Sequence, residues 1–263
     1  MKTNATTRTL SIAGTELTVT EWGAGRPILL LHGGAGPQSI AGFAELLATT
    51  EAARVIAPTH PGFGGTHRPE TLTTIAGLAE LYAGLLTELD LRDVTLVGNS
   101  IGGWIAAEMA LRDASRIGGI VLVSAVGIEV AGHPVADVFA LTLDELMQLS
   151  YHAPAAFRVN PAQLSDAQRA VFAGNRAALA VYAGSRSSVD PTLRGRLGGI
   201  EVPALVLWGE SDRVVDPAYG RAYADAIPRA RFQLLPATGH VPQIETPAQL
   251  LAPIWQFASS PAA

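Results

Sequence analysis

The sequence predicts an α/β fold, with a mostly parallel sheet of eight strands and helices on both of its faces. Apolar runs of strand length alternate with longer segments of helical spacing, an order typical of parallel strands joined by right-handed crossovers. Most of these runs are continuously apolar, as expected of strands that are covered on both faces. The alternation is interrupted once, between about residues 127 and 198, where the residues predict several helices and no clear strand.

Composition and charge narrow the class of protein. The 263 residues suit one large α/β domain or two small ones, and a hydrophobic fraction of 48% is ample for a core. The formal net charge is -5 and Lys and Arg form no block, which argues against nucleic acid and against an anionic membrane surface as partners. Because the chain has no cysteine, disulfides, thiolate nucleophiles and cysteine-based metal or iron–sulfur sites are excluded.

The sequence also predicts neither a signal peptide nor a membrane-spanning segment. The first nine residues are polar and Thr-rich, without the apolar core of a signal peptide. No run approaches the roughly 18 apolar residues of a membrane span. We therefore expect a cytoplasmic protein. The expected partner is a small-molecule substrate, and the expected assembly is a monomer or a homodimer.

The elements of the core follow one another in a regular order. Two short alternating runs, residues 9–13 and 16–22, predict an antiparallel hairpin at a sheet edge. The six further strands are predicted at residues 27–31, 54–57, 93–97, 119–124, 203–208 and 231–235. The helices between and after them are predicted at residues 40–49, 73–90, 104–111, 217–226 and 247–257, the second capped by Thr73 or Thr74.

The interruption between residues 127 and 198 predicts a helical insertion. Residues 142–150 and 166–184 have helical patterns, and the stretch is too long for a plain loop. It leaves the sheet after the sixth strand and rejoins it at Val202. We therefore expect a core of residues 1–126 and 199–263, with residues 127–198 as a helical cap over the carboxyl edge of the sheet. A separate helical domain is the alternative interpretation.

The segment Gly98-Asn99-Ser100-Ile101-Gly102 joins a buried strand directly to a helix. Such a sharp turn holds its apex residue, Ser100, in a strained conformation, and side chains two positions away on either side would collide. Gly98 and Gly102 supply the small residues that the turn needs. The turn lifts the serine hydroxyl clear of the sheet and points N–H groups of the new helix at it.

A serine hydroxyl needs a base within hydrogen-bond reach before it becomes a good nucleophile, and the base needs a carboxylate to orient it. His240 follows the last predicted strand and Asp212 follows the strand before it. Because carboxyl ends of parallel strands meet at one edge, Ser100, Asp212 and His240 are predicted to lie together. Asp216 is the rival acid, but the Pro217 that follows it favours a role as helix cap.

Along nearly its whole length the chain resembles the α/β-hydrolase superfamily. Four motifs carry the resemblance, at residues 32–34, 98–102, 208–217 and 239–247. The resemblance implies that Ser100 is the nucleophile, His240 the base and Asp212 the acid. It also implies an oxyanion hole formed by the backbone N–H of Ile101 with that of Gly34 or Ala35. The neighbouring residues expected to contact substrate are Gly33, Asn99, Trp104 and Val241.

The other histidines and the glycine-rich loops predict no cofactor chemistry. His32 and His60 are expected to be structural, and His67, His133 and His152 to face solvent or to belong to the cap. No paired spacing of His and carboxylates predicts a metal site. The glycine-rich loops do not match the nucleotide-binding patterns, so we expect no cofactor.

The substrate is the least determined feature. The main prediction is a cofactor-independent serine hydrolase that cleaves a small or medium carboxylic ester or thioester through an acyl-enzyme. Asn99 and the loop at residues 32–37 are similar to carbon–carbon bond hydrolases of vinylogous diketo acids, although those enzymes usually carry an aromatic residue where this chain has Val241. Asn99 would alternatively only hydrogen-bond neighbouring loops. The carbon–carbon hydrolases also need a cap arginine for the substrate carboxylate, and the candidates are Arg158, Arg169, Arg176 and Arg186.

A third hypothesis comes from a different class. The same fold could serve as a ligand-binding protein with slow turnover or none, because a fold does not determine chemistry.

Overall fold

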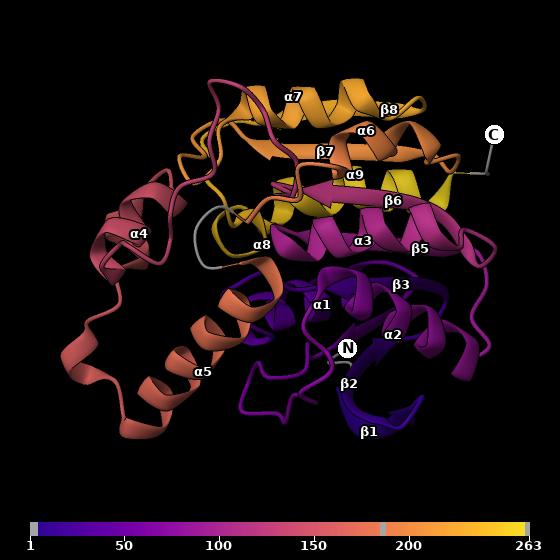
Figure 1. Cartoon of the computed structure of the whole chain (residues 1–263), viewed down its shortest axis with the longest axis horizontal. Coiled ribbons are helices and arrows are strands. Elements are labelled where there is room, and N and C mark those ends of the chain that lie inside the picture. The colour runs from indigo at the N-terminus through magenta and orange to yellow at the C-terminus, as the bar shows by residue number, and fades with distance from the viewer. Residues whose placement is uncertain (1–4, 185–187, 261–263) are drawn as a thin grey trace.

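The computed structural model describes residues 5–184 and 188–260, which are built around one eight-stranded sheet (Figure 1). The strand order is β1-β2-β4-β3-β5-β6-β7-β8, and only the pairs β1–β2 and β2–β4 are antiparallel. The prediction of eight mostly parallel strands with an antiparallel hairpin at one edge is confirmed. The strands are β1 (Thr6–Ile12), β2 (Thr15–Gly23), β3 (Arg26–Leu31), β4 (Ala53–Pro58), β5 (Val94–Asn99), β6 (Ile117–Val123), β7 (Ala204–Gly209) and β8 (Ala230–Leu235).

The continuously apolar strands are buried on both faces. In β3, Ile28 and Leu30 join the core on one side of the sheet, and Leu29 and Leu31 join the core on the other. Successive side chains of a strand point to opposite faces, so a strand between two helical layers must be apolar at every position. This is why these strands read as unbroken apolar runs in the sequence.

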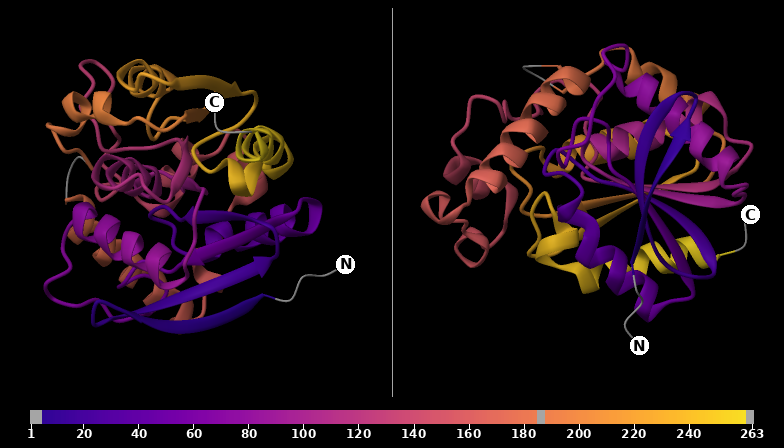
Figure 2. Two further views of the ribbon diagram at one scale, coloured as in Figure 1. Left: turned by 90° about the vertical axis from the view of Figure 1, so that its right-hand side faces the viewer. Right: turned by 90° about the horizontal axis from the view of Figure 1, so that it is seen from below.

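The helices form two layers on the sheet (Figure 2). Apolar residues of α2 (Ile75–Glu88), α3 (Ile101–Arg112) and α7 (Pro217–Ala226) belong to one core, and those of α1 (Gln38–Thr50) and α9 (Pro247–Ser259) to the other. Of the two threonines predicted to cap α2, Thr74 does so, because its hydroxyl accepts from the N–H of Gly77 at 3.0 Å. Within the described part of the chain, no helix combines the length and hydropathy needed to cross a bilayer.

The inserted segment (residues 127–198) leaves after β6 and rejoins the sheet before β7. It contains α4 (Leu143–Ser150), α5 (Asp166–Ala183) and α6 (Leu193–Arg196), with short 3₁₀ turns at Pro154–Phe157, Pro161–Gln163 and Leu197–Gly199. Capping boxes at Thr142 and Ser165 start α4 and α5. Figure 1 shows α4 and α5 on the side toward which β6 and β7 point.

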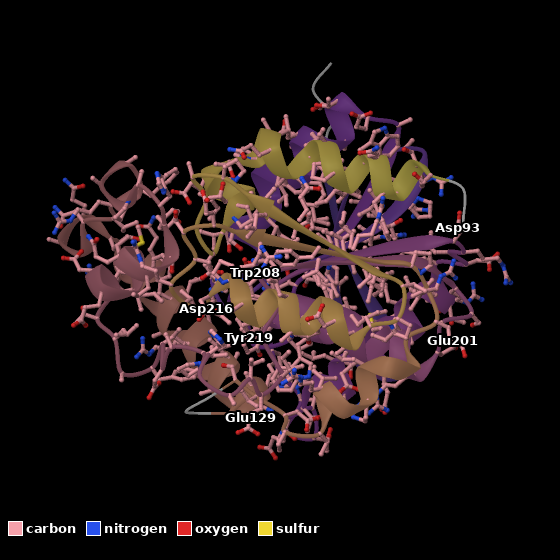
Figure 3. All side chains as sticks on the ribbon, turned by 90° about the horizontal axis from the view of Figure 1, so that it is seen from above. Asp93, Glu129, Glu201, Trp208, Asp216 and Tyr219 are labelled. Carbon is pink, nitrogen blue, oxygen red and sulfur yellow. The ribbon has the colours of Figure 1, made fainter. Side chains whose placement is uncertain are left out.

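Both ends of the inserted segment are tied to the core. At its start, the hydroxyl of Tyr219 on α7 donates to the carbonyl of Ile128 at 2.6 Å and accepts from its N–H at 2.8 Å. Figure 3 labels Tyr219 at the end of α7 that faces the inserted segment. At its return, Arg196 makes two hydrogen bonds to the buried carboxylate of Glu108 on α3, at 2.5 and 3.1 Å, and a third to Asp190 at 2.9 Å. The path of the segment is therefore set by polar contacts at both junctions.

Candidate active site

Ser100 stands between β5 and α3 in a left-handed backbone conformation, with φ 55° and ψ -118°. A Cβ at Gly98 would lie 2.1 Å from the carbonyl oxygen of Gly102, and a Cβ at Gly102 would lie 2.3 Å from that of Leu31. No side chain fits at either distance, so the turn requires glycine at both positions. The strained turn expected from the sequence is present, and it exposes part of Ser100 at the carboxyl edge of the sheet.

His240 and Asp212 meet on the loops that follow β8 and β7. The Nδ1 atom of His240 lies 2.8 Å from Oδ2 of Asp212, and the Asp212 side chain is fully buried. The other carboxylate oxygen of Asp212 accepts from the N–H groups of Val214 at 3.0 Å and Val215 at 3.1 Å. With Nδ1 occupied, Nε2 is the imidazole nitrogen that can serve a serine hydroxyl. The carboxylate is thus fixed by the backbone before it orients the imidazole.

Asn99 links the serine turn to the histidine loop. Its side-chain N–H₂ donates to the carbonyl of Val123 at 3.2 Å and to that of His240 at 3.0 Å. Its side-chain oxygen accepts from Nε2 of Gln243 at 3.1 Å. The Asn99 side chain is buried, and these bonds hold the residue next to Ser100 against the backbone of His240.

Carbonyl groups of the glycine-rich loop after β3 have hydrogen-bond partners of their own. The carbonyl of Gly33 accepts from Nδ1 of His32 at 2.8 Å and from the N–H of Gly36 at 3.1 Å. A Cβ at Gly33 would lie 3.1 Å from the Cβ of Ser100, so this loop runs directly beside the serine. Within the described residues, no acceptor takes the N–H groups of Gly34 or Ala35.

Two buried histidines, His32 and His60, bond to the backbone at the start of this loop. The ring centroids of His32 and His60 are 3.7 Å apart. Nε2 of His32 accepts from the N–H of His60, and Nε2 of His60 donates to the carbonyl of His32, so the backbone fixes both tautomers. Burial lowers the pKa of His32 to about 4, and burial together with the neighbouring His32 lowers the pKa of His60 well below its usual value. Both rings are therefore neutral structural groups at physiological pH.

Comparison with known proteins shows the family of the chain. Residues 28–253 match the model of the alpha/beta hydrolase family. The chain belongs to the alpha/beta hydrolase family. This α/β hydrolase is 28% identical to a 2-hydroxymuconate semialdehyde hydrolase of Pseudomonas sp. strain CF600, over 95% of this chain and 93% of that protein. It is 30% identical to a 2-hydroxy-6-oxo-2,4-heptadienoate hydrolase of Pseudomonas putida, over 90% of this chain and 91% of that protein.

A solved structure gives the same fold. A serine hydrolase involved in carbazole degradation matches with a TM-score of 0.77 at 22% identity, covering 97% of this chain and 99% of that one. The predicted fold and the predicted membership of the α/β hydrolases are therefore confirmed.

The end of α4 in this α/β hydrolase is hydrogen-bonded to the loops that carry His240 and Asp212. The N–H of His240 donates to the carbonyl of Ser150 at 2.7 Å. Glu245 accepts from the N–H of Gly239 at 2.6 Å and from that of Ala153 at 3.0 Å. Arg213, the residue after Asp212, donates to main-chain carbonyls at the end of α4. Hydrogen bonds from the inserted segment therefore help to fix the positions of both loops.

The rival acid Asp216 has a different position. One oxygen of its carboxylate accepts from the N–H groups of Ala218 at 2.9 Å and Tyr219 at 3.1 Å, and so caps α7, as its sequence context favoured. The other oxygen lies 2.7 Å from Nδ1 of His133 in the inserted segment. Asp216 therefore joins a helix start to the inserted segment and is not the partner of His240.

The remaining predicted residues are dispersed. Trp104 is buried on α3 against Gly127, and its indole N–H has no hydrogen-bond partner among the described residues. Val241 is buried at the start of α8 (Pro242–Glu245). His67 is exposed, and His152 bonds to Ser211 at 2.7 Å. Neither the contacts of Trp104 nor those of Val241 place a substrate, so their predicted roles stay predictions.

The candidate cap arginines are engaged with other groups. Arg158 pairs with Asp144 at 3.1 Å, and Arg169 pairs with Asp166 at 2.6 Å. Arg176 donates to the carbonyl of Phe139 and lies over its ring. The fourth candidate, Arg186, lies outside the described residues.

Four residues of the site escaped the sequence reasoning: Asn175, Arg213, Gln243 and Glu245. Asn175 carried the clearest signal, since it is the one polar residue in a helical apolar stripe that includes Ala178, Leu179 and Tyr182. Gln243 and Glu245 lie within the predicted motif at residues 239–247, but their partners are backbone groups that no residue pattern reveals.

Proposed function

We propose that this α/β hydrolase is a serine hydrolase that cleaves a small or medium carboxylic ester or thioester through an acyl-enzyme. The observation that carries the proposal is the buried His240–Asp212 pair, with its carboxylate fixed by two backbone N–H groups, on the same sheet edge as the strained Ser100. Such a pair supports general-base activation of a nearby hydroxyl.

In the first half of the reaction, the Oγ atom of Ser100 bonds to the substrate carbonyl carbon and its proton passes to Nε2 of His240. The carbonyl oxygen then carries the negative charge. The N–H of Ile101 at the start of α3, with that of Gly34 or Ala35, would stabilise this oxyanion, and each such donor is worth roughly 10²–10³ in rate. The bond to the alcohol or thiol breaks as His240 returns the proton to the leaving group, and Ser100 remains acylated.

In the second half, water attacks the acyl carbon while His240 takes one of its protons. The tetrahedral intermediate collapses, the proton returns to Oγ of Ser100, and the carboxylic acid leaves. Asp212 keeps Nδ1 protonated and stabilises the imidazolium in both halves. Asn99, which we had expected at the substrate, is better assigned to positioning, because its side-chain groups bond to Val123, His240 and Gln243.

We also propose that the inserted segment (residues 127–198) acts as a cap over this edge. Its helices α4 and α5 contact the loops that follow β3, β4, β7 and β8, and the apolar side chains of α4 are only partly buried. Such an apolar, incompletely packed layer above a nucleophile suits a substrate cleft.

The contacts of the three candidate arginines that the structure describes support a neutral substrate. Arg158, Arg169 and Arg176 each bond to a carboxylate or a carbonyl of the inserted segment itself. A substrate carboxylate would have to compete with these partners.

A second candidate is hydrolysis of a carbon–carbon bond in a vinylogous diketo acid. It is favoured by the two Pseudomonas relatives, which are named as hydrolases of 2-hydroxymuconate semialdehyde and of 2-hydroxy-6-oxo-2,4-heptadienoate. In that reaction the group leaving the carbonyl carbon is a stabilised carbanion, which must receive its proton on carbon.

The test is hydrolysis of p-nitrophenyl acetate and butyrate, with labelling of the nucleophile by a fluorophosphonate. We expect turnover and labelling of the wild type, and loss of both in Ser100→Ala. Turnover that persists in Ser100→Ala would refute the mechanism. An unlabelled and inactive wild type would favour a ligand-binding protein. Stopped-flow absorbance with a 2-hydroxy-6-oxo-dienoate distinguishes the second candidate, whose much faster consumption than that of the esters would replace the ester assignment.

A further inference from the structure

Helix α5 has a buried face that lies on the loops after β3 and β4, at the sheet edge that carries Ser100. Its buried side chains include Asn175, Leu179 and Tyr182, which are spaced by four and three residues and so share one side of the helix. Leu179 covers the glycine-rich loop so closely that a Cβ at Gly34 would lie 2.8 Å from its Cδ2 atom. The hydroxyl of Tyr182 donates to the carbonyl of Pro61 at 2.9 Å.

Asn175 is the polar residue of this face, and both polar atoms of its amide bond to backbone groups of two loops. Its side-chain oxygen accepts from the N–H of Gly64 at 2.8 Å. Its side-chain N–H₂ donates to the carbonyl of Ala35 at 3.2 Å. Because the Gly64 N–H can only donate, the oxygen must face Gly64 and the N–H₂ must face Ala35. Only 3% of the residue is exposed.

The bond to Ala35 bears on the oxyanion hole of the proposed function. The Ala35 carbonyl shares a peptide plane with the N–H of Gly36, which donates to the carbonyl of Gly33. Gly36 has φ +90°, and a Cβ there would lie 2.4 Å from the Asn175 nitrogen, so the loop is shaped around this amide. Among the described residues, no group accepts from the N–H of Gly34 or of Ala35, which leaves both donors available to an oxyanion.

We infer that Asn175 is a positioning residue that holds the glycine-rich loop in its oxyanion-binding conformation. The oxyanion hole is therefore complete only while α5 is docked on the core. The inference rests on the proposed function for its catalytic consequence, and on the hydrogen bonds of Asn175 for the hold itself. The inference couples docking of the inserted segment to the activity of the site, because a displaced α5 removes the amide that holds the carbonyl of Ala35 and the N–H of Gly64.

Three variants test the inference. Asn175→Ala removes both bonds and is expected to lower kcat for p-nitrophenyl butyrate by roughly 10- to 100-fold with KM changed by less than about 3-fold, because a small misplacement costs transition-state contacts. A trifluoromethyl ketone, which forms a tetrahedral oxyanion on serine, should lose affinity by the same factor as kcat/KM. Tyr182→Phe, on the same helix face, removes one bond to another loop and should change neither quantity by more than about 2-fold.

Asn175→Asp gives a readout that a merely packing role would not move. The acid accepts from Gly64 in both protonation states, but it donates to Ala35 only when protonated. The activity of Asn175→Asp relative to wild type should therefore rise as the pH falls from 8 to 6. A ratio that is constant with pH, or an Asn175→Ala variant with unchanged kcat, overturns the inference.

Hydrogen exchange separates this inference from the proposed function, because it needs no substrate. In Asn175→Ala we expect faster exchange of the amides in residues 33–37 and 62–66, whereas Tyr182→Phe should leave residues 33–37 unchanged. If exchange is unchanged in Asn175→Ala, Asn175 does not hold the loop. If exchange accelerates while the wild type is neither labelled nor active, the hold stands and the proposed function fails.

Discussion

The buried His32–His60 pair predicts a loss of stability in mild acid. Burial lowers the pKa of His32 from 6.5 to about 4 in the folded protein. Well above pH 6.5, His32 is neutral in both the folded and the unfolded states and does not lower the free energy of unfolding. Between pH 6.5 and 4 the unfolded chain binds a proton that the folded chain does not, so stability falls as the pH falls. From these two values, His32 alone costs about 2 kcal/mol at pH 5 and about 3 kcal/mol at pH 4.

The contribution of His60 has the same sign, since its pKa is also lowered by burial and by the charge of His32. A proton on Nε2 of His32 would also point at the N–H of His60, which now donates to that nitrogen at 3.1 Å. Acid should therefore loosen the support of the glycine-rich loop.

The assay is urea unfolding followed by tryptophan fluorescence at pH 7.5 and pH 5. In this window most carboxylates stay ionised, so the histidines dominate the change. His32→Asn keeps an N–H for the carbonyl of Gly33 but does not titrate. Its loss of unfolding free energy from pH 7.5 to 5 should be smaller than that of the wild type by about 2 kcal/mol. The exposed His67→Gln is the control and should behave as wild type.

An equal loss in His32→Asn and wild type would refute this reasoning. The wild type offers a second check, because the His32 ring should titrate near pH 4 by NMR. A midpoint near 6.5 would show that burial does not hold the ring neutral.

Four further predictions follow from the geometry. Asp212→Asn should lower kcat for p-nitrophenyl butyrate on the order of 10⁴-fold, by loss of the correct tautomer. Asp216→Ala should lower the free energy of unfolding by about 1 kcal/mol, by loss of the α7 cap, and leave kcat within a few-fold. Gly98→Ala should destabilise by about 3 kcal/mol or more by clash with the turn, whereas Gly42→Ala, in open space on α1, should stabilise by roughly 0.5–1 kcal/mol in a thermal melt. Arg196→Ala should cost about 3 kcal/mol in the same melt, because it strips the main partner from a buried carboxylate on α3.

Each of these predictions has an outcome that contradicts it. Equal kcat losses in Asp212→Asn and Asp216→Ala would mean that either acid serves the histidine. An unchanged melt for Gly98→Ala would show that the turn relaxes without cost. The exposed pair Arg158–Asp144 is the control for Arg196, and Arg158→Ala should cost less than about 0.5 kcal/mol.

The fold could be predicted almost completely because its signals are local. Burial on both faces makes a strand apolar at every position, and helices with one buried face repeat with the helical period. The strand–helix order then fixes parallel pairing and brings the strand ends to one edge. Residues 242–245 were not predicted as a separate helix, since a four-residue helix after Pro242 is too short to have a period.

The candidate site could be predicted only in part. Ser100, Asp212 and His240 could be selected as candidates because each follows its own strand, and parallel topology brings strand ends to one edge. Asn175 and Glu245 could not be assigned partners, because they bond to backbone N–H and carbonyl groups that every residue carries. The sequence identifies the side chains, but it does not show which backbone N–H and carbonyl groups lack a partner in the secondary structure.

The difference between main-chain and side-chain contacts bears on the proposed role of the inserted segment. The segment would help to form the site and would still allow different substrates to fit. Its contacts with the catalytic edge through Asn175 and Ser150 are hydrogen bonds to main-chain groups of Ala35, Gly64 and His240. These main-chain groups are the same whatever the substrate, so the contacts constrain only a few positions of the segment. The half-buried apolar side chains of α4 take no part in them and are free to vary with the acyl or alcohol group. Under the proposed function, the positioning of the reaction and the choice of substrate would rest on different residues of the same segment. Substitutions on α4 are therefore expected to move KM among esters, whereas substitutions at Asn175 move kcat for all of them.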